Sequence, residues 1–204
     1  MTVRGRLVRL FPPFLLALGF SALAEFVRQP SIAGFAGVLF VWYLVPPLCF
    51  RLHNRLWPLR EGREDLADGR KYSAWWGSQQ FQIVYTMIPQ LEMVLRLVPG
   101  AYSAWLRLWG SRIGRGVMWT PVVEIMDRSM LEIGDQVLIG HQVAMVSHTV
   151  MPKGGRHVLH LARIRIGSGA FISGRSGLGL GARVAPGEFL SFGSHVYLNR
   201  RFGP

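Results

Sequence analysis

The stretch that decides the fold is "IGSGAFISGRSGLGLGARVAPGEFLSFGSHVYL", which runs from Ile166 to Leu198. Within it an aliphatic residue returns at every sixth position: Ile166, Ile172, Leu178, Val184, Leu190 and Val196. An α-helix repeats every 3.6 residues or so and a strand every two, and neither period explains this spacing. Such a repeat is typical of a chain that winds into a coil, with short strands separated by regular turns.

The pattern also extends upstream of this stretch. Its earlier positions are Ile113, Trp119, Ile125, Ile133, Ile139 and Met145. The step from Ile125 to Ile133 is eight residues, which indicates two extra residues there. Small residues often follow the aliphatic one and let the chain turn. We therefore predict that residues 112–204 form a parallel β-helix, with three strands in each coil of about eighteen residues. A flexible Gly-rich loop would not keep the aliphatic phase on both sides.

Residues 1–50 are predicted to form a hydrophobic helical hairpin. No charged residue interrupts 10–24 or 31–50, and the second run is long enough to cross a hydrocarbon core of about 30 Å. Arginines flank the pair: Arg4, Arg6 and Arg9 before it, and Arg51, Arg55 and Arg60 after it. By the positive-inside rule both ends stay cytoplasmic. Pro46 and Pro47 are expected to kink or break the second helix near its end. The alternatives are a cleaved signal peptide for the first run and a buried core hairpin for both.

Composition favours a membrane over a nucleic-acid partner. The chain has 204 residues, a formal net charge of +12, and is half hydrophobic. No basic-aromatic motif for nucleic acid is present, and an arginine excess suits anionic lipid or phosphate groups. The lone Cys49 permits no internal disulfide and no cysteine-based metal site. We expect a protein of the inner (cytoplasmic) membrane, with residues 112–204 on the cytoplasmic side.

Two further segments join these parts. Residues 51–72 are charged and interrupted by proline, and we expect a linker on the membrane surface. Residues 73–111 carry a stripe of apolar residues at helical spacing, which predicts an amphipathic helix kinked at Pro89 and ended by the "PG" at 99–100, followed by a short second helix. Trp105 and Trp109 suit either the membrane interface or packing against the coil, and the sequence leaves this open.

The stretches "IGDQVLIGHQV" and "IGSGAFISGRSGLGLGARVAPG" resemble the hexapeptide-repeat acyltransferases, in particular their membrane-tethered members. The lead-in "AYSAWLRLWGSRIGRGVMW" resembles that of the hexapeptide domains that end some peptide-polymer synthetases. The resemblance implies a mainly-β fold with a left-handed β-helix and a homotrimer. It also implies an acyl-CoA or acyl-carrier-protein donor, with acetyl-CoA first. The acyl group would pass directly, without a metal, to a hydroxyl or amine of a small-molecule, glycan or lipid-linked acceptor.

Direct acyl transfer needs a general base, and imidazole titrates near neutral pH. In the resembled family a base histidine commonly sits where a loop leaves the coil, and His148 matches that position. Counting repeats back through the two-residue insertion places His148 near Arg128, with Asp127 beside it. Asp127 or Glu124 would then accept a hydrogen bond from one ring nitrogen and orient the other. The alternative is that "EIMDR" makes an ion pair at the corner.

The resemblance also suggests where the donor binds. Loop 149–163 would cover the site of the neighbouring subunit, and its Lys153 and Arg156 would meet CoA phosphates. The alternative is a solvated basic loop with a turn at "KGG". In the last coils the candidates are two cations, Arg175 and Arg183, and two glycines, Gly177 and Gly179. The glycines would let a pantetheine arm lie close to the backbone.

Two other functions are compatible with the same fold. A γ-type carbonic anhydrase needs three histidines on one metal, for which His141, His148 and His160 are candidates, although their spacing matches that family poorly. A non-catalytic trimeric scaffold needs no site. His53, in the linker, is expected at the interface, and His195 on the surface of the last repeat.

Overall fold

The computed structural model describes residues 2–66 and 71–204, which form two compact units. The first unit holds residues 2–59 and 71–91 and is helical. The second holds residues 60–66 and 92–204 and contains every described strand. The short segment 60–66, predicted as linker, therefore belongs with the β-helix.

The first unit consists of α-helices and one π-helical segment. They are α1 (Val3–Val8), α2 (Phe11–Arg28), α3 (Ile32–Leu39), the π-helix η1 (Phe40–Leu44), α4 (Val45–Leu56) and α5 (Ala74–Met87). The Ser31 hydroxyl accepts a hydrogen bond from the Gly34 N–H at 3.0 Å, which caps the start of α3. A buried cluster of Leu15, Val41, Trp42 and Val84 packs α2, η1 and α5 together.

The second apolar helix continues past its two prolines, where the sequence predicted a kink or a break. Pro46 and Pro47 lie in the first turn of α4, directly after η1. A proline in the first turn of a helix removes an N–H that would have no intrahelical partner, so it costs little there. The helix therefore extends to Leu56, six residues beyond the predicted hairpin.

Two helical segments of this unit are long and apolar enough to cross a bilayer, by length and composition. They are Val3–Arg28, with a mean hydropathy of 1.8, and Ile32–Leu56, with a mean hydropathy of 1.9. Only 11% and 22% of their most apolar windows are buried in the structure. Such exposed apolar helices agree with the hairpin that the sequence predicts.

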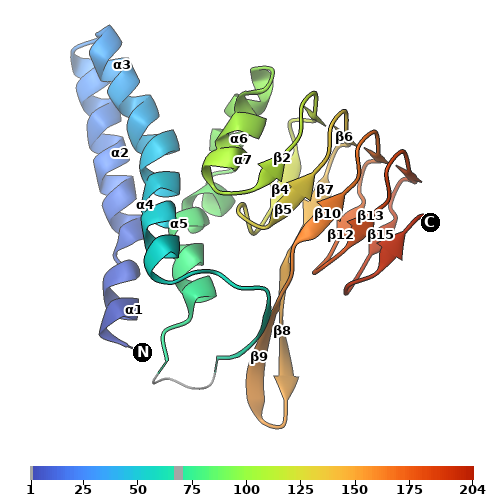
Figure 1. The fold of residues 1–204 in the computed structure, drawn as a ribbon. Helices are drawn as coiled ribbons and strands as arrows, with labels where there is room; N and C mark the ends of the chain where they lie inside the picture. The colour runs from blue at the N-terminus through green and yellow to red at the C-terminus, as the bar shows by residue number, and fades with distance from the viewer. Residues whose placement is uncertain (1, 67–70) are drawn as a thin grey trace. The chain divides into compact units, whose positions relative to one another are not determined.

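From Glu92 on, the second unit contains most of α6 (Gln90–Leu97), then α7 (Ala101–Leu108) and a coil of short parallel strands (Figure 1). The helix predicted to kink at Pro89 is instead broken there, since α5 ends at Met87 and α6 begins at Gln90. The predicted end at the "PG" is present, and Gly100 has a φ of 77°. Trp105 in α7 and Trp109 directly after it are 3% and 0% exposed, and their rings contact each other, with centroids 5.7 Å apart. They therefore pack in the core of the second unit, which decides between the two alternatives for α7.

Three parallel sheets form the faces of the coil. Sheet B runs in the order β16 (Arg201–Phe202), β13 (Arg183–Val184), β10 (Ile164–Ile166), β5 (Leu131–Ile133) and β2 (Arg112–Ile113). Sheet C has β14 (Phe189–Leu190), β11 (Phe171–Ile172), β6 (Leu138–Ile139) and β3 (Met118–Trp119). Sheet D has β15 (His195–Val196), β12 (Gly177–Leu178), β7 (Val143–Met145) and β4 (Val123–Ile125).

The strand register confirms the predicted repeat. Arg165 pairs with Arg183, and Arg183 with Arg201, so each coil here advances 18 residues. The sixth-position aliphatic side chains fill the interior, as Ile139, Met145 and Ile172 show with exposures of 0%. The three parallel sheets therefore confirm a parallel coil of the kind that the repeat predicts.

The coil is interrupted by a β-hairpin where the sequence predicted an extruded loop. Strands β8 (His148–Lys153) and β9 (Arg156–Leu161) pair antiparallel, and Gly154 and Gly155 at the tip have φ values of 56° and 73°. Strand β1 (Gly62–Asp65) adds to the outer edge of β9. The hairpin projects from the rod in Figure 1, and "KGG" forms its turn as predicted.

Candidate active site

The candidate site lies at the corner where the chain passes from sheet D to sheet B. Two departures from the six-residue repeat stack there. The first lies between β4 and β5, where Ile125 to Ile133 takes eight residues. The second is the hairpin. Because of it, Glu132 and its partner Arg165 are separated by 33 residues, whereas a regular coil takes 18. Asp127 belongs to the first insertion, and His148 opens the second.

These two insertions bring an imidazole and a carboxylate into contact. His148 Nδ1 lies 2.7 Å from Asp127 Oδ2. The Asp127 side chain is 1% exposed, whereas that of His148 is 17% exposed and reaches the surface. The Ser147 backbone N–H donates to the same Oδ2 at 3.1 Å. A carboxylate oxygen only accepts, so this arrangement places the proton on Nδ1 and makes Nε2 the basic nitrogen.

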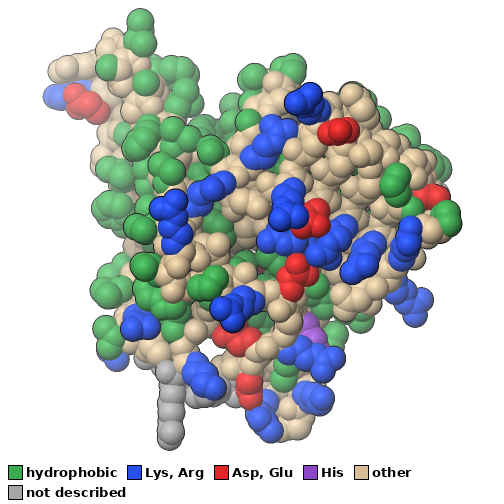
Figure 2. Space-filling view, viewed as in Figure 1, with side chains coloured by type: hydrophobic (Ala, Val, Ile, Leu, Met, Phe, Trp, Pro, Cys, Tyr) green, Lys and Arg blue, Asp and Glu red, His purple; other side chains and the backbone are tan. Residues whose placement is uncertain are grey.

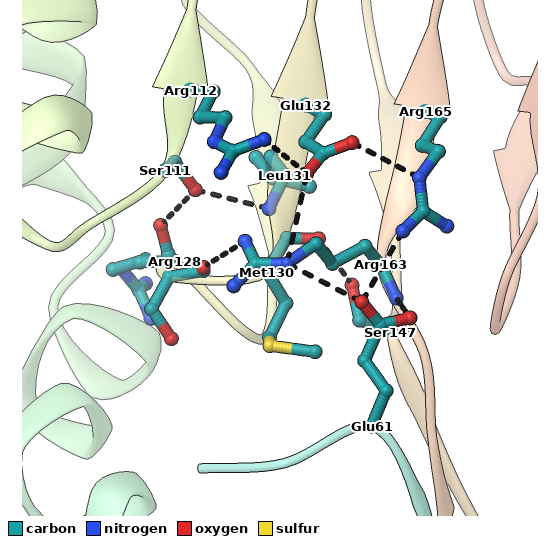
Figure 3. A network of polar contacts seen from close by, with 11 residues as sticks. Glu61, Ser111, Arg112, Arg128, Met130, Leu131, Glu132, Ser147, Arg163 and Arg165 are labelled. Atoms are coloured by element: carbon teal, nitrogen blue, oxygen red, sulfur yellow. Dashed lines mark hydrogen bonds and ion pairs between the residues drawn. The ribbon is translucent and has the colours of Figure 1, made fainter. Parts of the chain in front are cut away.

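Hydrogen bonds hold both insertions in place (Figure 3). The Ser147 hydroxyl donates to the Met130 carbonyl at 3.3 Å, which links the start of the hairpin to the loop below. The Ser111 hydroxyl donates to the Arg128 carbonyl at 2.7 Å and accepts from the Leu131 N–H at 3.0 Å. These side chains therefore fix the backbone that follows Asp127.

A buried charge cluster secures the residue after Asp127. Glu92, on α6, forms ion pairs with Arg96 at 2.6 Å and with Arg128, and these side chains are only 2–4% exposed. The Tyr102 hydroxyl donates to Glu92 at 2.6 Å. Burial, followed by the negative charge of Glu92, raises the pKa of Tyr102, so its phenol remains a donor at neutral pH. We call Glu92, Arg96, Tyr102 and Arg128 the Glu92 cluster.

The structure distinguishes between the two carboxylates proposed for His148. Asp127 contacts the imidazole, whereas Glu124 is exposed on β4 and pairs in register with Ala144. Arg128 pairs with Glu92, so the ion pair proposed for the corner goes to α6 instead. The expected stacking of Ile125 against Met145 is present in the register of β4 and β7.

The six residues expected to bind the donor lie in three places. Lys153 and Arg156 are at the tip of the hairpin, beside a hollow of about 450 Å³, and Arg156 pairs with Asp65 at 3.3 Å. Arg175, Gly177 and Gly179 belong to sheet D and the corners beside it. Arg183 lies on sheet B, away from the other three.

The glycine at 177 is covered by a side chain of the next coil. A Cβ built on Gly177 would lie 2.3 Å from His195 Nδ1, so the imidazole rests on its backbone. His195 in turn stacks on Tyr197, with ring centroids 5.2 Å apart. Gly179 follows β12, whose Leu178 carbonyl accepts from the Val146 N–H at 3.0 Å, and so it lies one coil beyond the His148 corner.

The other histidines do not join His148. His141 and His195 are exposed, and His160 pairs with Arg63 in the hairpin sheet. His53, expected at the interface, is a buried residue of α4, 2.7 Å from the Tyr72 hydroxyl. Within residues 2–66 and 71–204, no three His, Cys, Asp or Glu side chains gather closely enough to hold a metal ion.

Sequence reasoning did not single out the Glu92 cluster, Ser111, Ser147 or strand β1. Their contacts join residues that are distant in the sequence, as in the pairing of Gly62 in β1 with Leu161 in β9. One signal was available and not used: arginines at 165, 183 and 201 recur at the coil length.

These features define a parallel β-helix that carries an aspartate–histidine pair at an interrupted corner. No family model and no curated protein matches the chain. Among solved structures, it is similar to a hexapeptide-repeat acetyltransferase from Vibrio cholerae, at 16% identity and a TM-score of 0.29, over 59% of this chain and 85% of that one.

Two serine acetyltransferases are also similar to it. Isoform 3 from Entamoeba histolytica shows 11% identity and a TM-score of 0.33, over 95% of this chain and 72% of that one. The enzyme from Neisseria gonorrhoeae shows 16% identity and a TM-score of 0.25, over 92% of this chain and 62% of that one. The function is therefore argued from the site alone.

Proposed function

We propose that this chain is a membrane-associated acyltransferase with a left-handed β-helix. It would move an acyl group, in the first instance acetyl, from acyl-CoA to a hydroxyl or amine of a small-molecule, glycan or lipid-linked acceptor. The observation that carries the proposal is the contact between His148 Nδ1 and Asp127 Oδ2 at 2.7 Å, at the corner where the hairpin leaves the coil. A half-buried imidazole held by a buried carboxylate is the arrangement that general-base chemistry needs.

The reaction follows from the tautomer that Asp127 selects. Nε2 of His148 takes the proton from the acceptor hydroxyl or amine as its oxygen or nitrogen attacks the thioester carbonyl. The tetrahedral intermediate collapses with cleavage of the carbon–sulfur bond, and the proton passes from Nε2 to the departing thiolate. Asp127 remains ionised and stabilises the imidazolium in between. The acyl group goes directly to the acceptor, so no covalent enzyme intermediate is formed.

For the donor we propose contacts on sheet D and the hairpin. Arg175, at the corner before β12, and the hairpin cations Lys153 and Arg156 would meet its phosphates. Gly177 and Gly179 would let the pantetheine arm lie near the backbone, which requires the exposed His195 ring to rotate away from Gly177. Arg183 lies on sheet B and not on sheet D, so it is not included in this donor site.

Membrane association is supported by the first unit. Its two apolar segments are long enough to span, and arginines flank both, which supports a rod on the cytoplasmic side of the inner membrane. Homotrimer formation is supported by an outward apolar row on sheet C: Met118, Leu138, Phe171 and Phe189. Met118 and Phe189 are 60% and 56% exposed. Light scattering of the detergent-solubilised chain would give its mass and test the trimer.

The function is tested by binding and then by turnover. Thermal unfolding of the detergent-solubilised chain is measured with acetyl-CoA, and a ligand at 100 times its Kd should stabilise it by about 2.7 kcal/mol. Membrane extracts then supply acceptors while thiol release from acetyl-CoA is recorded. His148→Ala should keep the thermal shift and lose about 10²- to 10⁴-fold in rate. Absence of a shift in folded protein would overturn the acyl-CoA donor, and an unchanged rate in His148→Ala would overturn the role of His148.

A further inference from the structure

A row of arginines follows the outer face of sheet B. Its members occupy equivalent positions on their strands, in the register Arg112–Glu132–Arg165–Arg183–Arg201. Neighbouring strands in a sheet lie about 4.8 Å apart, so the guanidinium groups succeed one another along the rod. We call Arg112, Arg165, Arg183 and Arg201 the arginine ladder.

The carboxylates near the ladder neutralise only one end of it. Glu132 pairs with Arg112 at 3.4 Å and with Arg165 at 3.0 Å. Glu61 pairs with Arg165 at 3.2 Å and with Arg163 at 3.4 Å (Figure 3).

At the other end, Arg183 and Arg201 form no ion pair with any residue in the described ranges 2–66 and 71–204. With Arg163 included, five arginines on this face meet two glutamates, which leaves three positive charges in excess.

This arrangement is unfavourable for the isolated rod. Arg183 and Arg201 lie directly opposite each other on neighbouring strands, and like charges in that position destabilise a sheet. Both side chains are exposed and support no buried contact. Arg183 and Arg201 therefore have no role in packing, and their charge calls for an anionic partner outside the chain.

The surface around the ladder is open to such a partner. The ladder lines a shallow groove of about 460 Å³, whose floor includes Gly134, Gly167, Ala185 and Pro186. These residues have little or no side chain to stand between a ligand and the guanidinium groups. Figure 2 shows Lys and Arg side chains gathered in a band over the part of the chain that forms the coil, with few acidic side chains among them.

We propose that the arginine ladder docks the rod on the phosphate headgroups of an anionic phospholipid membrane. Guanidinium groups bind phosphate oxygens through paired hydrogen bonds. A row along the rod suits many phosphates on a surface better than one small ligand. Each basic residue at an anionic leaflet strengthens attachment by about fivefold.

The connection to the first unit favours this partner. Glu61 lies five residues after Leu56, the last residue of the apolar helix α4, so the ladder is joined to that helix by a short tether. The proposal rests on the membrane association proposed above and not on acyl transfer.

Arginine labelling in nanodiscs tests the proposal directly. The full chain is placed in nanodiscs of phosphatidylcholine alone or with phosphatidylglycerol, treated with phenylglyoxal, and analysed by peptide mass spectrometry. Arg183 and Arg201 should be modified at least about fivefold more slowly in the anionic discs. Arg115 and Arg200 are exposed arginines outside the ladder and serve as internal controls. Their rates should not change, and 0.5 M salt should remove the protection of the ladder.

Matched variants supply a second readout. R183Q/R201Q removes two free cations of the ladder, and R115Q/R200Q removes the same charge elsewhere. Anionic discs should raise the unfolding temperature of the wild type and of R115Q/R200Q, but not of R183Q/R201Q. Because R183Q/R201Q relieves a repulsive pair, it should fold and be at least as stable as the wild type in phosphatidylcholine.

Equal labelling in both discs would overturn the docking surface. So would protection by soluble pyrophosphate without protection by anionic lipid, because the ladder would then serve a soluble phosphate ligand. A chain that fails to enter nanodiscs would instead overturn the membrane association. None of these outcomes depends on turnover, so the acyltransferase proposal is tested separately.

Discussion

Replacing Glu92 by glutamine removes one negative charge from the Glu92 cluster and leaves its volume almost unchanged. The native carboxylate is 3% exposed as a residue and accepts from Arg96, Tyr102 and Arg128. In Glu92→Gln both guanidinium groups stay buried, with side-chain exposures of 2%, and face a neutral amide whose NH₂ group cannot accept. The variant therefore tests how strongly this cluster holds the second unit together.

The expected cost is about 3–5 kcal/mol, the usual effect of removing one partner from a buried ion pair. Water does not screen the remaining charges at these exposures. The exposed pair Glu25–Arg28 is the matched control, since its N···O distance is 3.0 Å but its side chains are 58% and 69% exposed. Glu25→Gln should cost no more than about 1 kcal/mol.

Urea unfolding of the full chain in detergent, followed by tryptophan fluorescence, measures the difference. Trp105 and Trp109 are buried in the second unit and report its unfolding. A triple change of Glu92, Arg96 and Arg128 to methionine should be more stable than Glu92→Gln, because no buried charge is left unpaired. A loss below about 1 kcal/mol in Glu92→Gln, or a triple variant less stable than the single one, would refute the reasoning.

Three further changes test other parts of the structure. Burial, then the charge of Glu92, raises the pKa of Tyr102, so its stabilising effect is complete below its ordinary pKa of about 10 and is lost as pH rises further. Tyr102→Phe should therefore flatten the alkaline fall in stability, which a pH series of urea midpoints would detect. Gly167→Ala places a Cβ 2.4 Å from Pro186 N and should cost about 1–3 kcal/mol, whereas Gly179→Ala, with no contact under 3.4 Å, should be tolerated in the same unfolding assay. His195→Ala uncovers Gly177 and should lower the KM for acetyl-CoA severalfold, and an unchanged KM would contradict a pantetheine arm at this glycine.

The coil could be predicted because its information is local and periodic. A side chain at every sixth position fills the interior and must be aliphatic. Three such repeats make one coil, as the pairing of Phe171 with Phe189 shows. The same periodicity revealed the two interruptions. The six-residue spacing of aliphatic residues is lost after Ile125 and again after Met145. Counting through the first interruption was enough to predict that Asp127 and His148 lie close together.

Other features depend on partners that are distant in sequence and have no periodic signal. Glu92 reaches Arg128 across 36 positions, and β1 pairs with β9 across about a hundred. The sequence also did not reveal that the helix continues past Pro46 and Pro47, which lie in the first turn of α4 directly after a π-helical segment. The donor candidates were chosen by their chemistry, and chemistry does not reveal that Arg183 faces a different side of the coil from Gly177.

The position of the aspartate–histidine pair has a consequence for how such a protein can change. Both side chains come from segments added to the coil, and neither occupies one of the sixth positions that fill the interior. The fold therefore depends on the residues that fill the interior of the coil, whereas the chemistry depends on the residues inserted at one corner. A designer could alter the two inserted segments and leave the remaining coils in phase, provided that the chain rejoins its partner strand in register and that Glu92 keeps a buried cationic partner.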